Sequence, residues 1–164
     1  MSDGTQSCTA SVATGSCTLT LTTAGAHTLT ATYAGDANFS GSTSAGEPHG
    51  VDPAAASQLI FTTQPSNVLL SGPITPPVVV TAQDQFGNTA TAFTGIVTVA
   101  IGTDASLLKN AVLGGTTSVA AASGVATFGG LTIDQLGLGY TLVVSSVAVP
   151  TGATSNPFNV VTIL

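Results

Sequence analysis

Short segments in which apolar and polar residues alternate recur along the chain. A period of two residues predicts β-strands that bury one face and expose the other. In the first part of the chain, the alternation predicts strands at residues 17–21 and 27–33. In the second part, it predicts strands at residues 59–63, 78–83, 95–102, 117–121, 124–128, 140–146 and 157–161. Gly, Pro, Asn and Asp separate these segments, and no segment has helical periodicity with capping residues. The pattern therefore predicts an all-β chain.

The number and spacing of these strands narrow the fold further. Seven short strands within roughly 100 residues are typical of one complete immunoglobulin-like β-sandwich with Greek-key connections. Earlier in the chain the strand pattern stops within residues 47–56, which are rich in Pro and Ala. We therefore predict a partial domain at residues 1–51, a connector at residues 52–57 and a complete domain at residues 58–164.

The first part of the chain repeats only the end of the later pattern. With one inserted residue, Leu19-Thr20-Leu21, Gly25 and Thr28-Leu29 align with Leu131-Thr132-Ile133, Gly137 and Thr141-Leu142. This alignment predicts that residues 7–51 form the last four strands of the same fold, so that the chain begins inside a repeat. Half a sandwich leaves one sheet face uncovered. We expect a neighbouring immunoglobulin-like repeat, such as the second domain, or a second copy of the chain to cover it.

Charge is scarce and almost entirely negative. Only 5% of the residues are charged, Lys109 is the single Lys or Arg, and the formal net charge is −6. Binding to nucleic acid or to an anionic membrane surface needs several Lys or Arg residues, so both partner classes are excluded. No apolar run approaches the roughly 20 residues of a membrane span, and membrane insertion is not expected. Residues 1–6 lack the features of a signal peptide, so we expect any secretion signal to lie upstream.

The two cysteines, Cys8 and Cys17, flank a predicted turn at Thr14-Gly15 between two short predicted strands. A cross-strand disulfide between them is feasible if the register cooperates, and free buried thiols are the alternative. A disulfide would favour an extracytoplasmic location.

Two stretches carry a family resemblance. The segment 31–42 contains Tyr33-Ala34-Gly35-Asp36-Ala37-Asn38-Phe39, which resembles the closing motif of bacterial immunoglobulin-like repeats. The segments 59–65, 80–88 and 124–134 resemble another such repeat, of the kind found in tandem along large surface proteins and adhesins. The resemblance implies a non-enzymatic spacer module, a parent protein with a role in adhesion, and a location outside the cell or at its surface.

Several residues of these motifs are expected to shape turns. Short side-chain oxygens can accept hydrogen bonds from nearby backbone N–H groups, and Gly adopts positive φ without strain. A Tyr that opens a strand after a turn can donate back to the preceding loop. The residues predicted to act in these ways are Asp36, Asn38, Asp84, Gly87, Asn88 and Tyr140.

The inventory of chemical groups is small. His27 and His49 lie outside any metal-ligand motif, and His27 is predicted to lie on a strand face. Glycoside hydrolysis needs two carboxyl groups roughly 5–10 Å apart. Glu47 and Asp52 are the pair that the connector could bring together, so a glycoside-hydrolysing module is the alternative function.

Two kinds of binding site remain as hypotheses. Oxygen ligands suit Ca²⁺, and Asp52, Asp84 and Asn88 are the candidate ligands, with turn capping as the alternative role. The chain has no Trp, and Phe86 and Phe93 beside loops are the candidate platforms for binding a polysaccharide. No other cofactor is expected.

Overall fold

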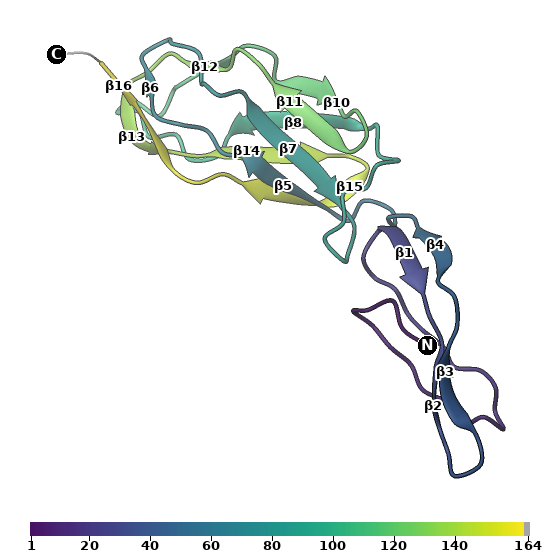
Figure 1. The fold of residues 1–164 in the computed structure, drawn as a ribbon. Coiled ribbons are helices and arrows are strands. Elements are labelled where there is room, and N and C mark those ends of the chain that lie inside the picture. Colours follow the sequence, from purple (N-terminus) through teal and green to yellow (C-terminus); the bar gives the residue numbers. More distant parts are fainter. Residues whose placement is uncertain (163–164) are drawn as a thin grey trace. The chain divides into compact units, whose positions relative to one another are not determined.

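The computed structural model describes residues 1–162, which contain strands and no helix (Figure 1). They form two compact units, one up to Pro53 and one from Ala54 onward, which are described separately. The first unit contains β1 (Gly25–Leu29), β2 (Thr32–Gly35), β3 (Ser40–Thr43) and β4 (Glu47–Val51). Among the described residues, no helix has the length and hydropathy that a membrane crossing requires.

The second unit contains twelve strands. Its strands are β5 (Gln58–Thr63), β6 (Val68–Leu69), β7 (Val78–Gln83), β8 (Ile96–Ile101), β9 (Leu113–Gly114), β10 (Ser118–Ala120), β11 (Val125–Phe128), β12 (Thr132–Ile133), β13 (Gly137–Tyr140), β14 (Leu142–Ser146), β15 (Val149–Thr154) and β16 (Phe158–Val161). Seven of them are hydrogen-bonded in the order β10-β8-β14-β15-β5-β7-β11. The end strands β10 and β11 also contact each other, so the strands enclose a common core.

The core of the second unit follows the alternation of the sequence. In β8, Val97 and Val99 are buried, whereas Ile96, Thr98 and Ala100 are exposed. The largest fully buried side chains include Tyr140 and Phe128. Burying an aliphatic or aromatic side chain contributes about 1.5–3 kcal/mol, so this core is the main source of stability in the second unit. The all-β sandwich predicted from the sequence is confirmed.

Each of the seven predicted strands overlaps an observed strand, but four strands of the second unit (β6, β9, β12 and β15) were not predicted. The clearest example is β15, which contains Pro150 and Gly152 and therefore has the composition of a turn. It is a strand because β14 pairs with it on one side and β5 meets it on the other. The predicted strand at residues 140–146 is divided into β13 and β14, with Thr141 between them.

The first unit consists of a long antiparallel hairpin and an irregular N-terminal segment. Strand β1 pairs with β4, and β2 pairs with β3. The strand expected at residues 17–21 is absent, because this segment forms no strand pairing. None of the residues 1–53 is buried. The first unit therefore lacks the apolar core that stabilises the second.

The hairpin of the first unit has the same connectivity as the end of the second. In the second unit β13 pairs with β16 and β14 pairs with β15, as β1 does with β4 and β2 with β3. In both cases two consecutive short strands run antiparallel to the next two. The first unit thus contains the closing hairpin of the sandwich seen in the second.

The Pro- and Ala-rich segment 47–57, which includes the connector predicted at residues 52–57, is more ordered than its composition indicates. Residues Glu47–Val51 form β4, in which Pro48 lies opposite Thr28. Pro is tolerated there because β4 has a partner on one side only. Ala54 and Ser57 donate backbone hydrogen bonds to Asp84 and Gln83, so residues 54–57 are part of the second unit.

Candidate functional site

The Asp84 carboxylate organises the loop after β7. Its Oδ1 accepts hydrogen bonds from the backbone N–H groups of Phe86 and Asn88, both at 2.9 Å. Its Oδ2 accepts from the Asn88 side-chain amide at 2.9 Å and from the backbone N–H of Ala54 at 3.0 Å. Gly87 lies in this turn with φ 85°. The side chain therefore fixes the turn and attaches the start of the second unit to it.

The protonation of Asp84 follows from this environment. Burial favours the neutral carboxyl group, since Asp84 is 0% exposed. The hydrogen bonds from Asn88, Ala54 and Phe86 outweigh burial and lower the pKa of Asp84 to about 2. Asp84 is therefore ionised at neutral pH.

The Ca²⁺ site hypothesised from Asp52, Asp84 and Asn88 is not supported by this geometry. A carboxylate offers about four acceptor positions, and four donors of the protein occupy those of Asp84. No group of three His, Cys, Asp or Glu side chains suited to a metal ion occurs in residues 1–162. Asp84 and Asn88 act together as a turn, which is the alternative that the sequence left open.

The carboxylates proposed for glycoside hydrolysis are also separated. Glu47 begins β4, and Asp52 follows directly after its last residue, Val51. A strand rises about 3.3 Å per residue, so the two Cα atoms lie roughly 16 Å apart. Side chains five positions apart on a strand point to opposite faces. The extended backbone of β4 therefore argues against the approach of these two acids that the sequence allowed.

Of the two aromatic residues considered as platforms, one is unsuitable. Phe93 is partly buried and packs against the core of the second unit. Phe86 is exposed in the Asp84 loop, and Phe39 is exposed at the tip of the hairpin in the first unit. The exposure of Phe39 was not predicted from the sequence. Its position in a turn motif could have indicated it.

That hairpin tip is held by Asp36. The Asp36 Oδ1 atom accepts backbone hydrogen bonds from Asn38 at 2.7 Å and Phe39 at 2.8 Å. The Tyr33 hydroxyl donates to its Oδ2 at 2.7 Å, and this bond together with the backbone bonds lowers the pKa of Asp36. The same bond raises the pKa of Tyr33. The motif therefore closes the turn between β2 and β3.

Tyr140 has the corresponding structural role in the second unit. Its ring is fully buried and lies 6.1 Å from that of Phe158, measured between ring centroids. Its hydroxyl donates to the backbone carbonyl of Gln135 at 3.0 Å. Desolvation by burial raises the pKa of Tyr140. This arrangement fixes the loop that leads into β13.

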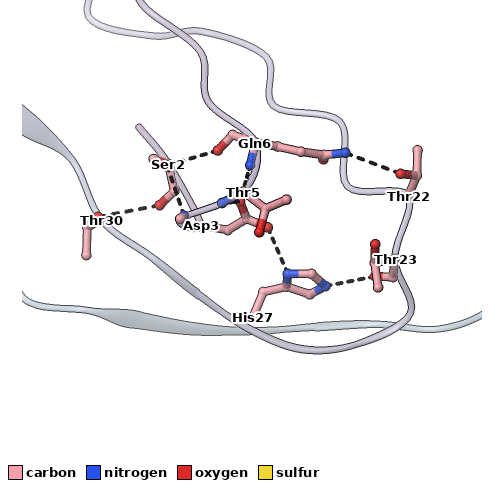
Figure 2. A network of polar contacts seen from close by, with 9 residues as sticks. Ser2, Asp3, Thr5, Gln6, Thr22, Thr23, His27 and Thr30 are labelled. Carbon is pink, nitrogen blue, oxygen red and sulfur yellow. Dashed lines mark hydrogen bonds and ion pairs between the residues drawn. The ribbon is translucent and has the colours of Figure 1, made fainter.

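A polar cluster that sequence reasoning missed joins the N-terminal residues to β1 (Figure 2). The His27 Nδ1 atom lies 2.9 Å from Asp3 Oδ2, and His27 Nε2 lies 2.8 Å from the carbonyl oxygen of Thr23. The other carboxylate oxygen of Asp3 accepts the backbone N–H groups of Gln6 and Thr5, and these bonds lower the pKa of Asp3. No local pattern signalled this cluster, because its residues are far apart in sequence.

The cluster does not form a catalytic triad. Such a triad needs a hydroxyl nucleophile on the second ring nitrogen of the histidine. In this protein the Nε2 atom faces a backbone carbonyl oxygen, which can only accept a hydrogen bond. The two ring nitrogens thus face a carboxylate and a backbone carbonyl, and neither faces a hydroxyl group. His27 therefore fastens the N-terminal segment to the hairpin.

A disulfide closes the loop in front of the hairpin. The sulfur atoms of Cys8 and Cys17 are bonded, and their Cα atoms are 5.9 Å apart. Between this loop and the hairpin lies an open hollow of about 600 Å³. Its walls include Val12 and Cys17 from the loop and Tyr33 and Thr43 from the hairpin. The hollow lies within the first unit.

Comparison with known proteins shows a similarity in the first unit. No curated protein sequence matches the chain significantly. The family model of the bacterial Ig-like domain (group 3) matches residues 1–51, which include the closing hairpin. Over these residues the chain is therefore similar to the bacterial Ig-like domain family of group 3, and its fold class is that of an immunoglobulin-like β-sandwich.

Proposed function

We propose that this chain is a non-enzymatic structural module that spaces other domains of a secreted or cell-surface bacterial protein. The parent protein would act in adhesion, as the resemblance to surface repeats implies. The family match and the disulfide support a location outside the cytoplasm. The two closing hairpins of equal connectivity support a repeat array.

The observation that carries the proposal is the parallel pairing of the opening strands β5 and β6 with the closing strands β15 and β16 of the second unit. Strand β6 runs parallel to β16, with Val68 opposite Val160 and Leu69 opposite Val161 (Figure 1). The backbone N–H of Leu70 donates to the carbonyl of Val161 at 2.8 Å. Earlier in the same two segments, β5 meets β15 in parallel at Gln58 and Thr151.

Parallel terminal strands resist tension in a particular way. Pulling on the two ends of the unit draws β6 towards its N-terminus and β16 towards its C-terminus. The hydrogen bonds between them are then loaded together in shear, rather than broken one after another. This geometry suits a module that must stay folded while it carries force between neighbouring domains.

The experiment is single-molecule stretching of the full chain from its two ends. We expect the second unit to unfold in one abrupt event. The variant Leu70→Pro removes the N–H group that bonds to Val161 and should lower the unfolding force. The variant Leu107→Pro, in an exposed loop away from this pairing, is the matched control. Equal unfolding forces for the chain and both variants would contradict the proposal.

A hydrolysis assay tests the enzymatic alternative directly. The full chain, Glu47→Gln and Asp52→Asn are each incubated with a set of bacterial and plant polysaccharides. We expect no release of reducing sugar from any of them, because the two carboxylates are too far apart to act together. Hydrolysis by the unaltered chain that either substitution abolishes would replace the structural role with an enzymatic one.

A further inference from the structure

The turn between β2 and β3 presents an asparagine whose side chain has no part in holding the turn (Figure 1). Asn38 is exposed, and its backbone N–H donates to Asp36 Oδ1 at 2.7 Å. The side chains of Asn67, Asn88 and Asn159, by contrast, are hydrogen-bonded to other parts of the second unit. Within residues 1–162, the side-chain amide of Asn38 makes no such bond. The turn therefore uses the backbone of Asn38 and leaves its amide group free.

The backbone conformation at this position does not require asparagine either. Asn often occupies turns because it tolerates positive φ better than most other residues with a side chain. Among the described residues other than Gly, positive φ occurs at Ser71, Lys109 and Ser123 and not at Asn38. The positive φ of this turn, 89°, is at Gly35. The conformation and hydrogen bonds of the turn thus do not account for Asn at position 38.

The two residues after Asn38 complete a modification signal. The segment Asn38-Phe39-Ser40 has the pattern Asn-x-Ser, with x other than Pro, which is the acceptor pattern for N-linked glycosylation. At each of the other asparagines, the residue two positions later is neither Ser nor Thr. Such a signal is used when it lies in an accessible surface segment. The sequence therefore offers a single acceptor, and the structure has to present it.

The structure presents this signal to solvent. Phe39 is 69% exposed, and both Asn38 and Ser40 are exposed. Ser40 begins β3, where its backbone lies opposite Gly35, and its hydroxyl group makes no hydrogen bond within residues 1–162. The two groups that a glycosyltransferase must reach, the Asn38 amide and the Ser40 hydroxyl, are therefore both accessible.

The turn can also open at a small cost in free energy. Its backbone is closed by the N–H of Asp36, which donates to the carbonyl of Phe39 at 2.8 Å, and by the pairing of β2 with β3. No residue of β2 or β3 is buried. Segments with few buried apolar contacts open locally without unfolding the rest of a protein. A transferase can therefore draw Asn38 and Ser40 into its own site while the second unit stays folded.

We propose that Asn38 is a site of N-linked glycosylation. The donor is a sugar whose anomeric carbon carries a diphosphate leaving group, as in a lipid-linked oligosaccharide diphosphate or a nucleotide-diphosphate sugar. The Asn38 Nδ2 atom forms a bond to the anomeric carbon, and the bond from that carbon to the diphosphate oxygen breaks. The oxygen keeps the electron pair, and one amide proton passes to a base of the transferase. The Ser40 hydroxyl binds the transferase and is not itself modified.

A glycan at this position would change the surface of the first unit. Only 5% of the residues of the chain are charged, and Phe39 exposes an apolar ring beside Asn38. An attached glycan is bulky and strongly hydrated, so it would increase solubility where the protein itself provides little charge. This inference adds a modification to the chain and does not depend on whether the chain carries force.

The test offers the folded full chain to two transferases. In one arm, the chain is incubated with a bacterial oligosaccharyltransferase and a lipid-linked oligosaccharide diphosphate. In the other arm, it is incubated with a soluble N-glycosyltransferase and UDP-glucose. Intact mass spectrometry measures the modified fraction, and peptide fragmentation locates the sugar. We expect a single glycan, at Asn38, in at least one arm, which then identifies the class of donor.

Variants of the signal separate this modification from any other. Asn38→Gln should abolish it, and Ser40→Ala should reduce the modified fraction to about one-tenth or less, because the hydroxyl group is lost. Ser40→Thr should retain it, since Thr also completes the signal. Asn110→Gln, at an exposed asparagine outside such a signal, is the matched control and should change nothing. Amide exchange across β2 and β3 verifies that each variant keeps the turn.

Three results would overturn the proposal. The first is a folded chain that neither arm modifies, including a chain that is modified only after denaturation, since the turn would then mask the signal. The second is a sugar that persists in Asn38→Gln. The third is an unmodified Asn38 in the protein isolated from its source cells. None of these results depends on the stretching experiment, so this proposal and the structural role can fail separately.

Discussion

The Nδ1 atom of His27 lies 2.9 Å from Oδ2 of Asp3, and this contact fastens the first residues of the chain to β1. The Asp3 side chain is only 3% exposed, although it belongs to a unit without buried residues. Backbone hydrogen bonds between Ser2 and Thr30, at 2.8 and 2.9 Å, extend the attachment. In the first unit, polar contacts and a disulfide thus hold segments that an apolar core would otherwise hold.

Replacing His27 tests this attachment. In His27→Gln, the side chain cannot bond to Asp3 and Thr23 at once in the same geometry. We expect the amides of Ser2 and Thr30 to exchange with solvent several-fold faster, measured by NMR. His49→Gln, at an exposed position on β4, is the matched control and should leave these rates unchanged. Unchanged rates in both variants would show that the contact contributes nothing to the attachment.

Removing the disulfide should weaken the first unit selectively. Closing a loop of this length stabilises the folded state by about 2.5 kcal/mol in the chain-entropy model. In the double variant Cys8→Ser/Cys17→Ser, we expect faster amide exchange across β1–β4 and unchanged exchange in β7. Reduction of the unaltered protein should give the same result. An equal effect on β7 would mean that the disulfide also stabilises the second unit.

Asp84 should be among the most sensitive positions of the second unit. Asp84→Asn replaces one acceptor oxygen with an amide donor. This donor would face N–H groups that now donate hydrogen bonds to Asp84. We expect the melting temperature of the second unit to fall by at least about 5 °C. Asp134→Asn is the matched control, because Asp134 is exposed and its described bond is one backbone N–H from Val112. Its effect should be much smaller.

The stability of the second unit should decrease in acid. The pKa of Asp84 is about 2 in the folded protein, below its ordinary value of 3.8. A carboxyl group with a lowered pKa stabilises the fold above its unfolded pKa and loses this effect as the pH falls towards the folded pKa. We therefore expect the melting temperature to fall between about pH 4 and pH 2. The decrease should be shallower in Asp84→Asn, and an identical slope would contradict the assignment.

Tyr140→Phe isolates the hydroxyl group at the end of β13. The substitution keeps the buried ring beside Phe158 but removes the hydrogen bond to Gln135. We expect a loss of about 1 kcal/mol in the free energy of unfolding of the second unit, measured by urea denaturation. Tyr33→Phe is the control, since Tyr33 lies in the first unit and should leave this transition unchanged.

Local periodicity predicted the strands that bury one face in a sheet. The alternation in β8 could be recognised because Val97 and Val99 face the core, while Thr98 faces solvent. The same alternation at residues 17–21 gave a wrong prediction, because no sheet in residues 1–162 receives that segment. Strand β15 was missed for the opposite reason, since its partners impose a conformation that its own composition does not favour.

Contacts at the candidate sites could be predicted from the sequence only where they join residues that are close in sequence. The disulfide and the Asp84 turn join residues close in sequence, and short spacing with suitable residue types is enough to indicate such contacts. The contact between Asp3 and His27 spans 24 residues and leaves no local pattern. The separation of Glu47 and Asp52 depends on β4, which forms because β1 pairs with it.

The sequence by itself therefore determined the all-β class, most strands of the core and the lack of enough basic residues to bind nucleic acid, and it made the disulfide feasible. Only the tertiary structure decided that Glu47 and Asp52 lie apart and that four protein donors bond to the Asp84 carboxylate. It also decided that β1 to β4 form sheets of only two strands. The physical reason is that the side-chain pattern of a strand encodes which face is buried. It does not encode which distant segment supplies the partner, since backbone hydrogen bonds between strands are nearly independent of sequence.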